Sequence, residues 1–110
     1  RVLKPTPQFL SYSVSKAGLH WLTTTLAQGM GPRIRVNAVG PGPTLKNPRQ
    51  SDADFSRQRD ATILGRGADP ADICGAVRYL LEAEAVTGQM IAVDGGQHLI
   101  WQTPDVQGGE

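Results

Sequence analysis

The sequence predicts an α/β fold built on a parallel β-sheet, and two observations carry that prediction. Helical and strand-like patterns alternate along the chain in the order helix, strand, loop, helix, strand, which is typical of parallel sheets. Only two strands are expected, and two parallel strands cannot bury the apolar faces of their helices. The 110 residues are therefore expected to form part of a larger domain whose other strands come from sequence not shown or from another chain.

The first expected element is a helix over residues 11–28. It follows a lead-in, residues 1–10, that Pro5 and Pro7 keep extended or irregular. The run GMGP at residues 29–32 ends the helix. Apolar residues recur along it at helical spacing and predict one core-facing stripe: Leu19, Leu22, Leu26 and Met30.

Two short apolar runs predict the strands. Residues 34–39, IRVNAV, are rich in β-branched side chains and are followed by GPGP. The second strand is expected at residues 90–93, after which the run DGG turns the chain away. Residues 102–110 are expected to form a polar, frayed tail.

Between the strands, a long polar segment precedes a strongly signalled helix. Residues 43–66 are expected to cover a site, with one short helix that Ser51 caps while Asp54 reaches back to it. The next helix has Asp69 as its N-cap and Pro70 at its first position. Its expected apolar face consists of Ile73, Ala76, Val77, Leu80 and Leu81.

Composition argues against several classes of protein. A net charge of +1 with only two Phe, two Tyr and two Trp does not fit a nucleic-acid-binding protein. No apolar run reaches membrane-spanning length and no signal peptide is visible, so no membrane partner is predicted. The single cysteine, Cys74, cannot form an internal disulfide and indicates a reducing cytoplasm. It is expected to be a small core residue of its helix.

Tyr12 and Lys16 stand four residues apart at the start of the first expected helix. Side chains at this spacing lie on one helical face, so the phenol and the ammonium can meet beside the helix. A neighbouring cation favours the deprotonated form of a phenol, which makes the phenol a better acid or base near neutral pH. The spacing also arises by chance, and on spacing alone a surface pair is the more common outcome.

Other polar residues have a structural interpretation beside a functional one. Asn37 is expected to satisfy buried backbone groups rather than to take part in chemistry. His20, one turn beyond Lys16, either approaches that residue's site or lies on the surface, and the surface is favoured. Neither His20 nor His98 has companions at metal-ligand spacing, so no metal site is predicted. Residues 98–101 are expected to pack on their own core rather than to complete a neighbour's pocket.

Four segments, in this order, carry a resemblance to a known family. They are the Tyr-x-x-x-Lys pair within YSVSKAGL, the RVNAV strand, the PGPT loop and the terminal TGQMIAVDGG. Over about residues 10–98 they resemble the C-terminal portion of short-chain dehydrogenases/reductases. The VGPGPT loop and the proline-rich lead-in are similar to pteridine-reductase-like members. The resemblance implies the C-terminal part of a Rossmann-like, doubly wound parallel sheet, incomplete as given.

The resemblance also implies roles for individual residues. Tyr12 would be the catalytic acid that protonates the substrate as hydride arrives, or the base in the reverse direction. Lys16 would promote this proton transfer and hydrogen-bond the nicotinamide ribose, so both residues would lie at the cofactor. Many members carry a threonine where this chain has Lys46, so the hydroxyl contact to the pyrophosphate is missing here unless Thr44 or Lys46 replaces it. The implied cofactor-binding loop consists of Pro41, Gly42, Pro43 and Thr44, whose backbone would meet the nicotinamide carboxamide.

Several of the family's motifs precede this segment and are absent from the 110 residues. They are the glycine-rich dinucleotide loop, the Asn-Asn-Ala-Gly strand and the serine that polarises the substrate carbonyl. The chain alone is therefore expected to be inactive, and its first partner is the missing N-terminal half of the same domain. The cofactor is expected to be NAD or NADP, and the pteridine-reductase likeness favours NADP.

Two functions are consistent with these residues. The first is an oxidoreductase that transfers a hydride between a nicotinamide cofactor and a small carbonyl, alcohol or pteridine-type substrate. The second is a truncated or degenerate, non-catalytic copy of the fold that acts as a binding or assembly module. The intact Tyr12 and Lys16 favour the enzyme, whereas the absent cofactor loop favours the module. The family commonly forms homodimers or homotetramers, and Val14 and Trp21 on the first helix are candidates for that contact.

Overall fold

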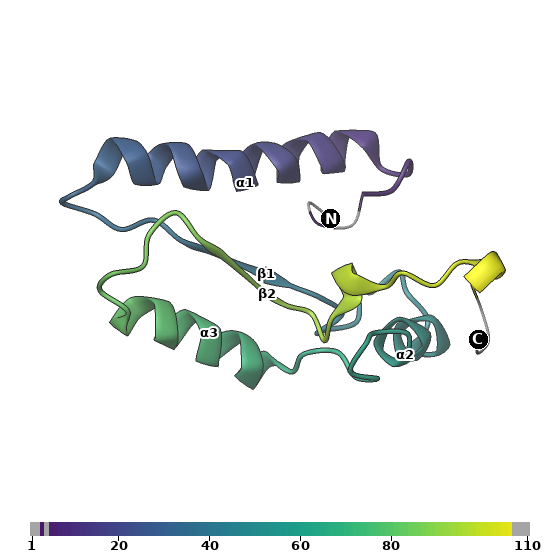
Figure 1. Cartoon of the computed structure of the whole chain (residues 1–110). Helices are drawn as coiled ribbons and strands as arrows, with labels where there is room; N and C mark the ends of the chain where they lie inside the picture. The colour runs from purple at the N-terminus through teal and green to yellow at the C-terminus, as the bar shows by residue number, and fades with distance from the viewer. Residues whose placement is uncertain (1–2, 4, 107–110) are drawn as a thin grey trace.

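The computed structural model describes residue 3 and residues 5–106, and within them two strands lie between two helices. Strands β1 (Ala38–Pro41) and β2 (Met90–Val93) pair in parallel, with Ala38 opposite Met90 and Pro41 opposite Val93. Figure 1 shows helix α1 (Leu10–Met30) over one face of this pair and α3 (Pro70–Glu82) over the other. The alternation in the sequence therefore predicted the α/β architecture correctly, and the sheet is only part of a full one.

The remaining elements are short. Helix α2 (Asp52–Asp60) lies in the segment between β1 and α3, and two single turns of 3₁₀ helix follow β2. These turns are η1 (Gln97–Leu99) and η2 (Pro104–Val106). Residues 1, 2 and 4 of the expected lead-in and residues 107–110 of the expected tail lie outside the described residues. Among the described helices, none has the length and hydropathy that a membrane crossing requires.

The first strand begins later than its β-branched run predicts. Residues 34–37 are not part of β1, because they lie opposite a turn rather than opposite β2. The Val36 N–H donates to the Thr87 hydroxyl at 3.1 Å, and the Val36 carbonyl accepts from the Gly88 N–H at 2.7 Å. Regular ladder pairing starts only at Ala38, and it continues into the GP sequence that was expected to close the strand.

The N-cap residues predicted for α2 and α3 are confirmed. The Ser51 hydroxyl accepts the Asp54 N–H at 3.1 Å at the start of α2. The return contact of a capping box, from the Ser51 N–H to the Asp54 carboxylate, is not formed, so that part of the expectation is wrong, and the carboxylate pairs with Arg57. At the start of α3, the Asp72 carboxylate accepts the Asp69 N–H at 2.8 Å. That contact, followed by the ion pair with Arg66, lowers the pKa of Asp72.

The apolar face predicted for α3 is buried only in part. Leu80 is 8% exposed against the strands, whereas Val77 is 43% and Leu81 is 72% exposed. Cys74 is exposed, so the expectation of a core cysteine is wrong. Two strands cover only a narrow stripe of the helix, and the residues beside that stripe face outward.

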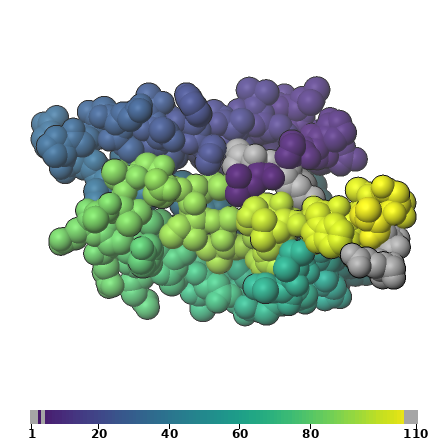
Figure 2. All heavy atoms as spheres, viewed as in Figure 1, coloured from purple at the N-terminus to yellow at the C-terminus, as the bar shows by residue number. Residues whose placement is uncertain are grey.

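The stripe predicted for α1 is wrong. Thr23 and Ala27 are the buried residues of this helix, and Leu22 and Leu26 remain 45% and 40% exposed. The small Ala27 side chain faces the turn that precedes β2. Its Cβ atom lies 3.4 Å from the position that a Cβ on Gly88 would take. Figure 2 shows α1 as a separate purple-to-blue band along the top of the molecule, above the rest of the chain.

Candidate functional site

The Tyr12 and Lys16 side chains meet on one face of α1, as their spacing predicted. The Lys16 Nζ atom lies 5.5 Å from the centroid of the Tyr12 ring, and Tyr12 is 51% exposed. Both residues lie in the first two turns of the helix, which begins at Leu10. A cation beside an accessible phenol is an arrangement that can carry acid–base chemistry.

A hollow of about 190 Å³ lies between this face of α1 and β1. Typical small-molecule pockets exceed about 300 Å³, so this hollow forms one wall of a site rather than a whole one. It reaches Pro41, at the carboxyl end of β1, where ligands bind in open α/β sheets. Its lining residues are Tyr12, Lys16, Leu19, His20, Thr23, Ala38, Val39, Gly40, Pro41 and Met90.

His20 lines this wall and is half-buried, so the favoured interpretation of a surface histidine is wrong. Its Nδ1 atom is buried and has no hydrogen-bond partner among the described residues, and the same holds for the Ser13 hydroxyl oxygen. Buried polar atoms in folded proteins are nearly always paired. The two atoms therefore mark a part of α1 whose polar environment is incomplete in residues 5–106.

The loop after β1 is held close to the end of β2. The Gly42 N–H donates to the Val93 carbonyl at 3.1 Å, which extends the strand pairing by one residue. A Cβ atom on Gly42 would lie 2.5 Å from the Asp94 Cβ, so only glycine allows this approach. The Thr44 hydroxyl donates to the Gly42 carbonyl at 3.0 Å, which closes the loop on itself.

Thr44 and Lys46 both have partners within this segment. The Lys46 Nζ lies 3.0 Å from a carboxylate oxygen of Asp52, at the start of α2. The Thr44 N–H, by contrast, donates to no acceptor within the described part of the chain. The next backbone N–H groups, of Leu45 and Lys46, likewise have no acceptor among the described residues, so this part of the loop leaves several donors open.

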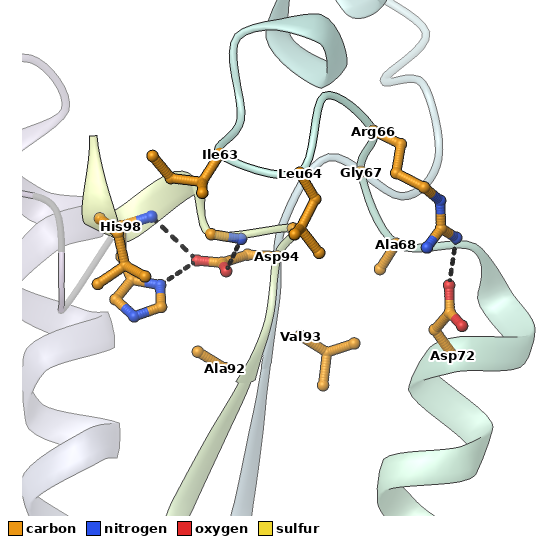
Figure 3. Close-up of a pocket in the computed structure, with 13 residues that line it drawn as sticks. Ile63, Leu64, Arg66, Gly67, Ala68, Asp72, Ala92, Val93, Asp94 and His98 are labelled. Atoms are coloured by element: carbon orange, nitrogen blue, oxygen red, sulfur yellow. Dashed lines mark hydrogen bonds and ion pairs between the residues drawn. The ribbon is translucent and has the colours of Figure 1, made fainter. Parts of the chain in front are cut away.

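Asp94, which was expected only to turn the chain after the second strand, is a buried carboxylate at the carboxyl end of β2. It accepts the Gly96 N–H at 2.9 Å, the His98 N–H at 3.2 Å and the His98 Nδ1 at 2.6 Å (Figure 3). Burial by itself raises the pKa of Asp94, but the hydrogen bond from the His98 ring and those from the two N–H groups outweigh it and hold the pKa below its ordinary value. The signal that could have revealed this role is the Asp-Gly-Gly turn with a histidine four residues after the aspartate.

A second hollow, of about 550 Å³, lies beside this pair. Its lining also includes Arg66 and Asp72, which form an ion pair at the start of α3 (Figure 3). His98 itself is half-buried against Asp94, but Leu99 and Trp101 are 56% and 65% exposed. The expectation that residues 98–101 pack on their own core is therefore wrong beyond the histidine. Within the described residues, no group of three His, Cys, Asp or Glu side chains could hold a metal ion.

Asn37 has the structural role that was expected of it. Its side-chain amide donates to the Val86 carbonyl at 2.9 Å, and its carbonyl oxygen accepts the Gln89 N–H at 3.0 Å. Both contacts fix the turn that leads into β2. Asn37 thus satisfies backbone groups beside the site and does not face the hollow that Tyr12 lines.

Comparisons with known proteins agree with this geometry. A family model described as enoyl-(acyl carrier protein) reductase matches residues 2–98. FolM alternative dihydrofolate reductase 1 from Brucella suis, solved in complex with NADP, is 53% identical over 96% of this chain, with a TM-score of 0.92. Dihydromonapterin reductase from Citrobacter koseri is 32% identical over 89% of the chain. The short-chain dehydrogenase/reductase homolog YusR from Bacillus subtilis is 34% identical over 82% of the chain.

The chain is shorter than these relatives. It spans 43% of the Brucella suis protein, 41% of the Citrobacter koseri reductase and 70% of YusR. The part that it matches contains the Tyr-x-x-x-Lys pair and the loop after β1.

Proposed function

Because the chain belongs to the short-chain dehydrogenase/reductase family, we propose that it is part of an NAD(P)-dependent oxidoreductase in which Tyr12 is the proton donor and acceptor. One observation carries the proposal: Tyr12 and Lys16 share the wall of a hollow at the carboxyl end of β1. The loop with a free Thr44 N–H begins at the edge of that hollow. The segment alone lacks the expected dinucleotide loop, so activity is proposed for the complete protein.

The residues present fit the nicotinamide end of a dinucleotide. Lys16 would donate to the ribose hydroxyls, and the free Thr44 N–H would donate to the carboxamide oxygen, with Pro41, Gly42 and Pro43 shaping the loop around it. When bound, the nicotinamide supplies or accepts the hydride. Tyr12 gives its phenolic proton to the substrate oxygen or nitrogen during reduction and takes a proton in the reverse direction. The Lys16 ammonium stabilises the phenolate that remains after the proton has left.

The likeness to FolM favours NADP over NAD and a pterin-type substrate over a simple alcohol. The Brucella suis protein, which was solved with NADP, is 53% identical to this chain. A Leptospira borgpetersenii short-chain dehydrogenase, which was solved with NAD+, is 38% identical to it. Residues 43–66, which include α2, are proposed to cover the substrate, since they start directly after the loop at the carboxyl end of β1.

The exposed leucines of α1 are proposed to pack against the other half of the domain, and Val14 and Trp21, 73% and 72% exposed, against a second copy in a homodimer or homotetramer. A single cysteine and no internal disulfide support a cytoplasmic location.

Replacement of Tyr12 in the complete protein tests the proposal. Tyr12→Phe removes one oxygen atom and should lower kcat by about a hundredfold or more, as expected for the loss of a positioned acid. Cofactor affinity should stay within about twofold, because the ring and the helix are unchanged. The measurement is NADPH oxidation with dihydropterin, dihydrofolate and carbonyl substrates.

Tyr79→Phe is the matched control, since Tyr79 is 55% exposed on α3 and lies outside the hollow. Its kcat should equal that of the parent. Lys16→Met should weaken cofactor binding as well as turnover, because it removes the ribose donor. Parent-like turnover of Tyr12→Phe on every substrate that the parent reduces would support the non-catalytic binding module instead.

A further inference from the structure

We infer that Arg59 is a positioning residue for the cofactor loop: from α2 it fixes the Pro43–Thr44 peptide so that the Thr44 N–H faces the ligand. The inference rests on the proposed function, because it assigns a purpose to the loop of that same site. No sequence pattern distinguishes Arg59, which lies on the same polar helix as the exposed Arg57.

The Arg59 guanidinium lies among backbone oxygens from two separate segments. Its Nη1 atom donates to the Pro43 carbonyl at 3.0 Å and to the Ala68 carbonyl at 3.1 Å, with the Thr44 carbonyl 3.5 Å away. Its Nη2 atom donates to the Asp69 carboxylate at 3.1 Å. The arginine thus joins the loop after β1 to the start of α3.

Burial separates Arg59 from the other arginine of α2. The Arg59 side chain is 21% exposed and its guanidinium lies 5.6 Å from the centroid of the Phe55 ring, whereas the Arg57 side chain is 77% exposed. Hydrogen bonds from a charged, partly buried donor are stronger than those of a solvated one. Arg59 therefore restrains the loop, whereas among the described residues the Arg57 side chain pairs only with Asp54, on its own helix.

The hydrogen bond to Pro43 sets the direction of the next amide. In a trans peptide the C=O and N–H bonds point in opposite directions across a planar unit. Because the Pro43 carbonyl points at Arg59, the Thr44 N–H points away from α2 and makes no hydrogen bond within residues 5–106. Loss of the arginine would let this peptide rotate, and the N–H would no longer be held in one direction.

Close packing around Gly67 supports a defined loop position. A Cβ atom on Gly67 would lie 2.2 Å from the Pro43 carbonyl oxygen and 3.2 Å from the Arg59 Cγ. The loop, the arginine and the segment before α3 thus share one crowded contact that only glycine permits. This arrangement prepares the loop before a ligand binds, which lowers the ordering cost of binding.

The test compares Arg59→Met with Arg57→Met in the complete protein. We expect Arg59→Met to raise the Kd for NADPH about tenfold, measured by fluorescence titration without substrate, and Arg57→Met to leave it within about twofold. KM for NADPH should rise in parallel while kcat stays within about threefold, because prearrangement of the loop aids ground state and transition state equally.

Arg59→Lys keeps the charge and can serve one or two of the oxygens, so it should raise Kd by only about threefold. If Arg59→Met does not fold, the Kd of Arg59→Lys tests the inference in its place. A parent protein that binds NADPH together with a folded Arg59→Met or Arg59→Lys of parent-like Kd would overturn this inference alone. A parent protein that binds no dinucleotide at all would overturn both it and the proposed function.

Discussion

The two sides of the molecule are held together in different ways. On the side of α3, side chains reach across the sequence to backbone groups: Arg35 donates to the carbonyls of Leu80, Leu81 and Val86 at 2.7, 3.0 and 3.2 Å. On the side of α1, the side-chain hydrogen bonds among the described residues stay within the helix, as with Thr23 to the Leu19 carbonyl. The candidate catalytic pair, Tyr12 and Lys16, therefore lies on the side that has fewer side-chain hydrogen bonds to other segments.

The proposed cofactor-binding loop and the proposed catalytic pair therefore differ in what holds them in place. The loop after β1 is fixed by groups that the chain itself supplies, including Gly42, Arg59 and the end of β2. Helix α1 carries Tyr12 and Lys16 but leaves its apolar residues open on several faces. We expect its position to depend on the rest of the domain, whereas the loop and α3 depend mainly on each other.

The largest expected effect on stability comes from Arg35. Arg35→Ala removes three hydrogen bonds and leaves carbonyls unpaired at the end of α3, which should lower the free energy of unfolding of the complete protein by about 3 kcal/mol. Urea unfolding measures this loss. Arg78→Ala, at an exposed position of α3, is the control and should change the free energy by less than about 0.5 kcal/mol. Equal losses in the two variants would mean that the side of α3 is not held by these contacts.

Leu26 tests whether α1 is covered by the rest of the domain. It is 40% exposed here, yet Leu26→Ala should lower the free energy of unfolding of the complete protein by about 2 kcal/mol, as expected for a core leucine. Leu45→Ala, at a loop residue that is 76% exposed, should cost less than about 0.5 kcal/mol. A similarly small cost for Leu26→Ala would show that this face of α1 is in contact with water.

Asp94, at the end of β2, should make the stability of the protein depend on pH. Its pKa is lowered in the folded protein, so its charged form stabilises the fold above the ordinary aspartate value of 3.8, and this stabilisation is lost as the pH falls through the lower folded value. Asp94→Asn should therefore lower the free energy of unfolding by about 1.5 kcal/mol at pH 7. The difference from the parent should shrink when unfolding is measured at pH 3. A difference that is constant between pH 7 and pH 3 would rule out the carboxylate as its cause.

The smallest effect is expected at the start of α2. Ser51→Ala removes the side-chain cap on the Asp54 N–H and should destabilise this helix by about 1 kcal/mol. Amide hydrogen exchange within α2 should then be about fivefold faster. Ser56→Ala, at an exposed position of the same helix, should leave exchange unchanged. Exchange that accelerates across α3 as well would show that α2 and the loop side unfold together.

Local chemistry in the sequence determined several elements by itself. The strand over residues 90–93 and its Asp-Gly-Gly turn, the N-cap at Ser51 and the start of α3 at Asp69 and Pro70 were all predicted at the right residues. The turn and the two helix starts depend on groups within four positions of one another, such as a hydroxyl and the N–H three residues later. The convergence of Tyr12 and Lys16 follows from helical spacing in the same way.

Only the tertiary structure decided which groups meet across the chain. It buries Thr23 and Ala27 rather than the leucines of α1, and the small Ala27 side chain permits a close approach to the turn at Gly88. In the tertiary structure β1 begins only at Ala38, and Arg59 donates to the carbonyl of Pro43, 16 residues away. Burial and hydrogen bonds of this range depend on segments that pass close together in space, and no local pattern of residues encodes which segments those are.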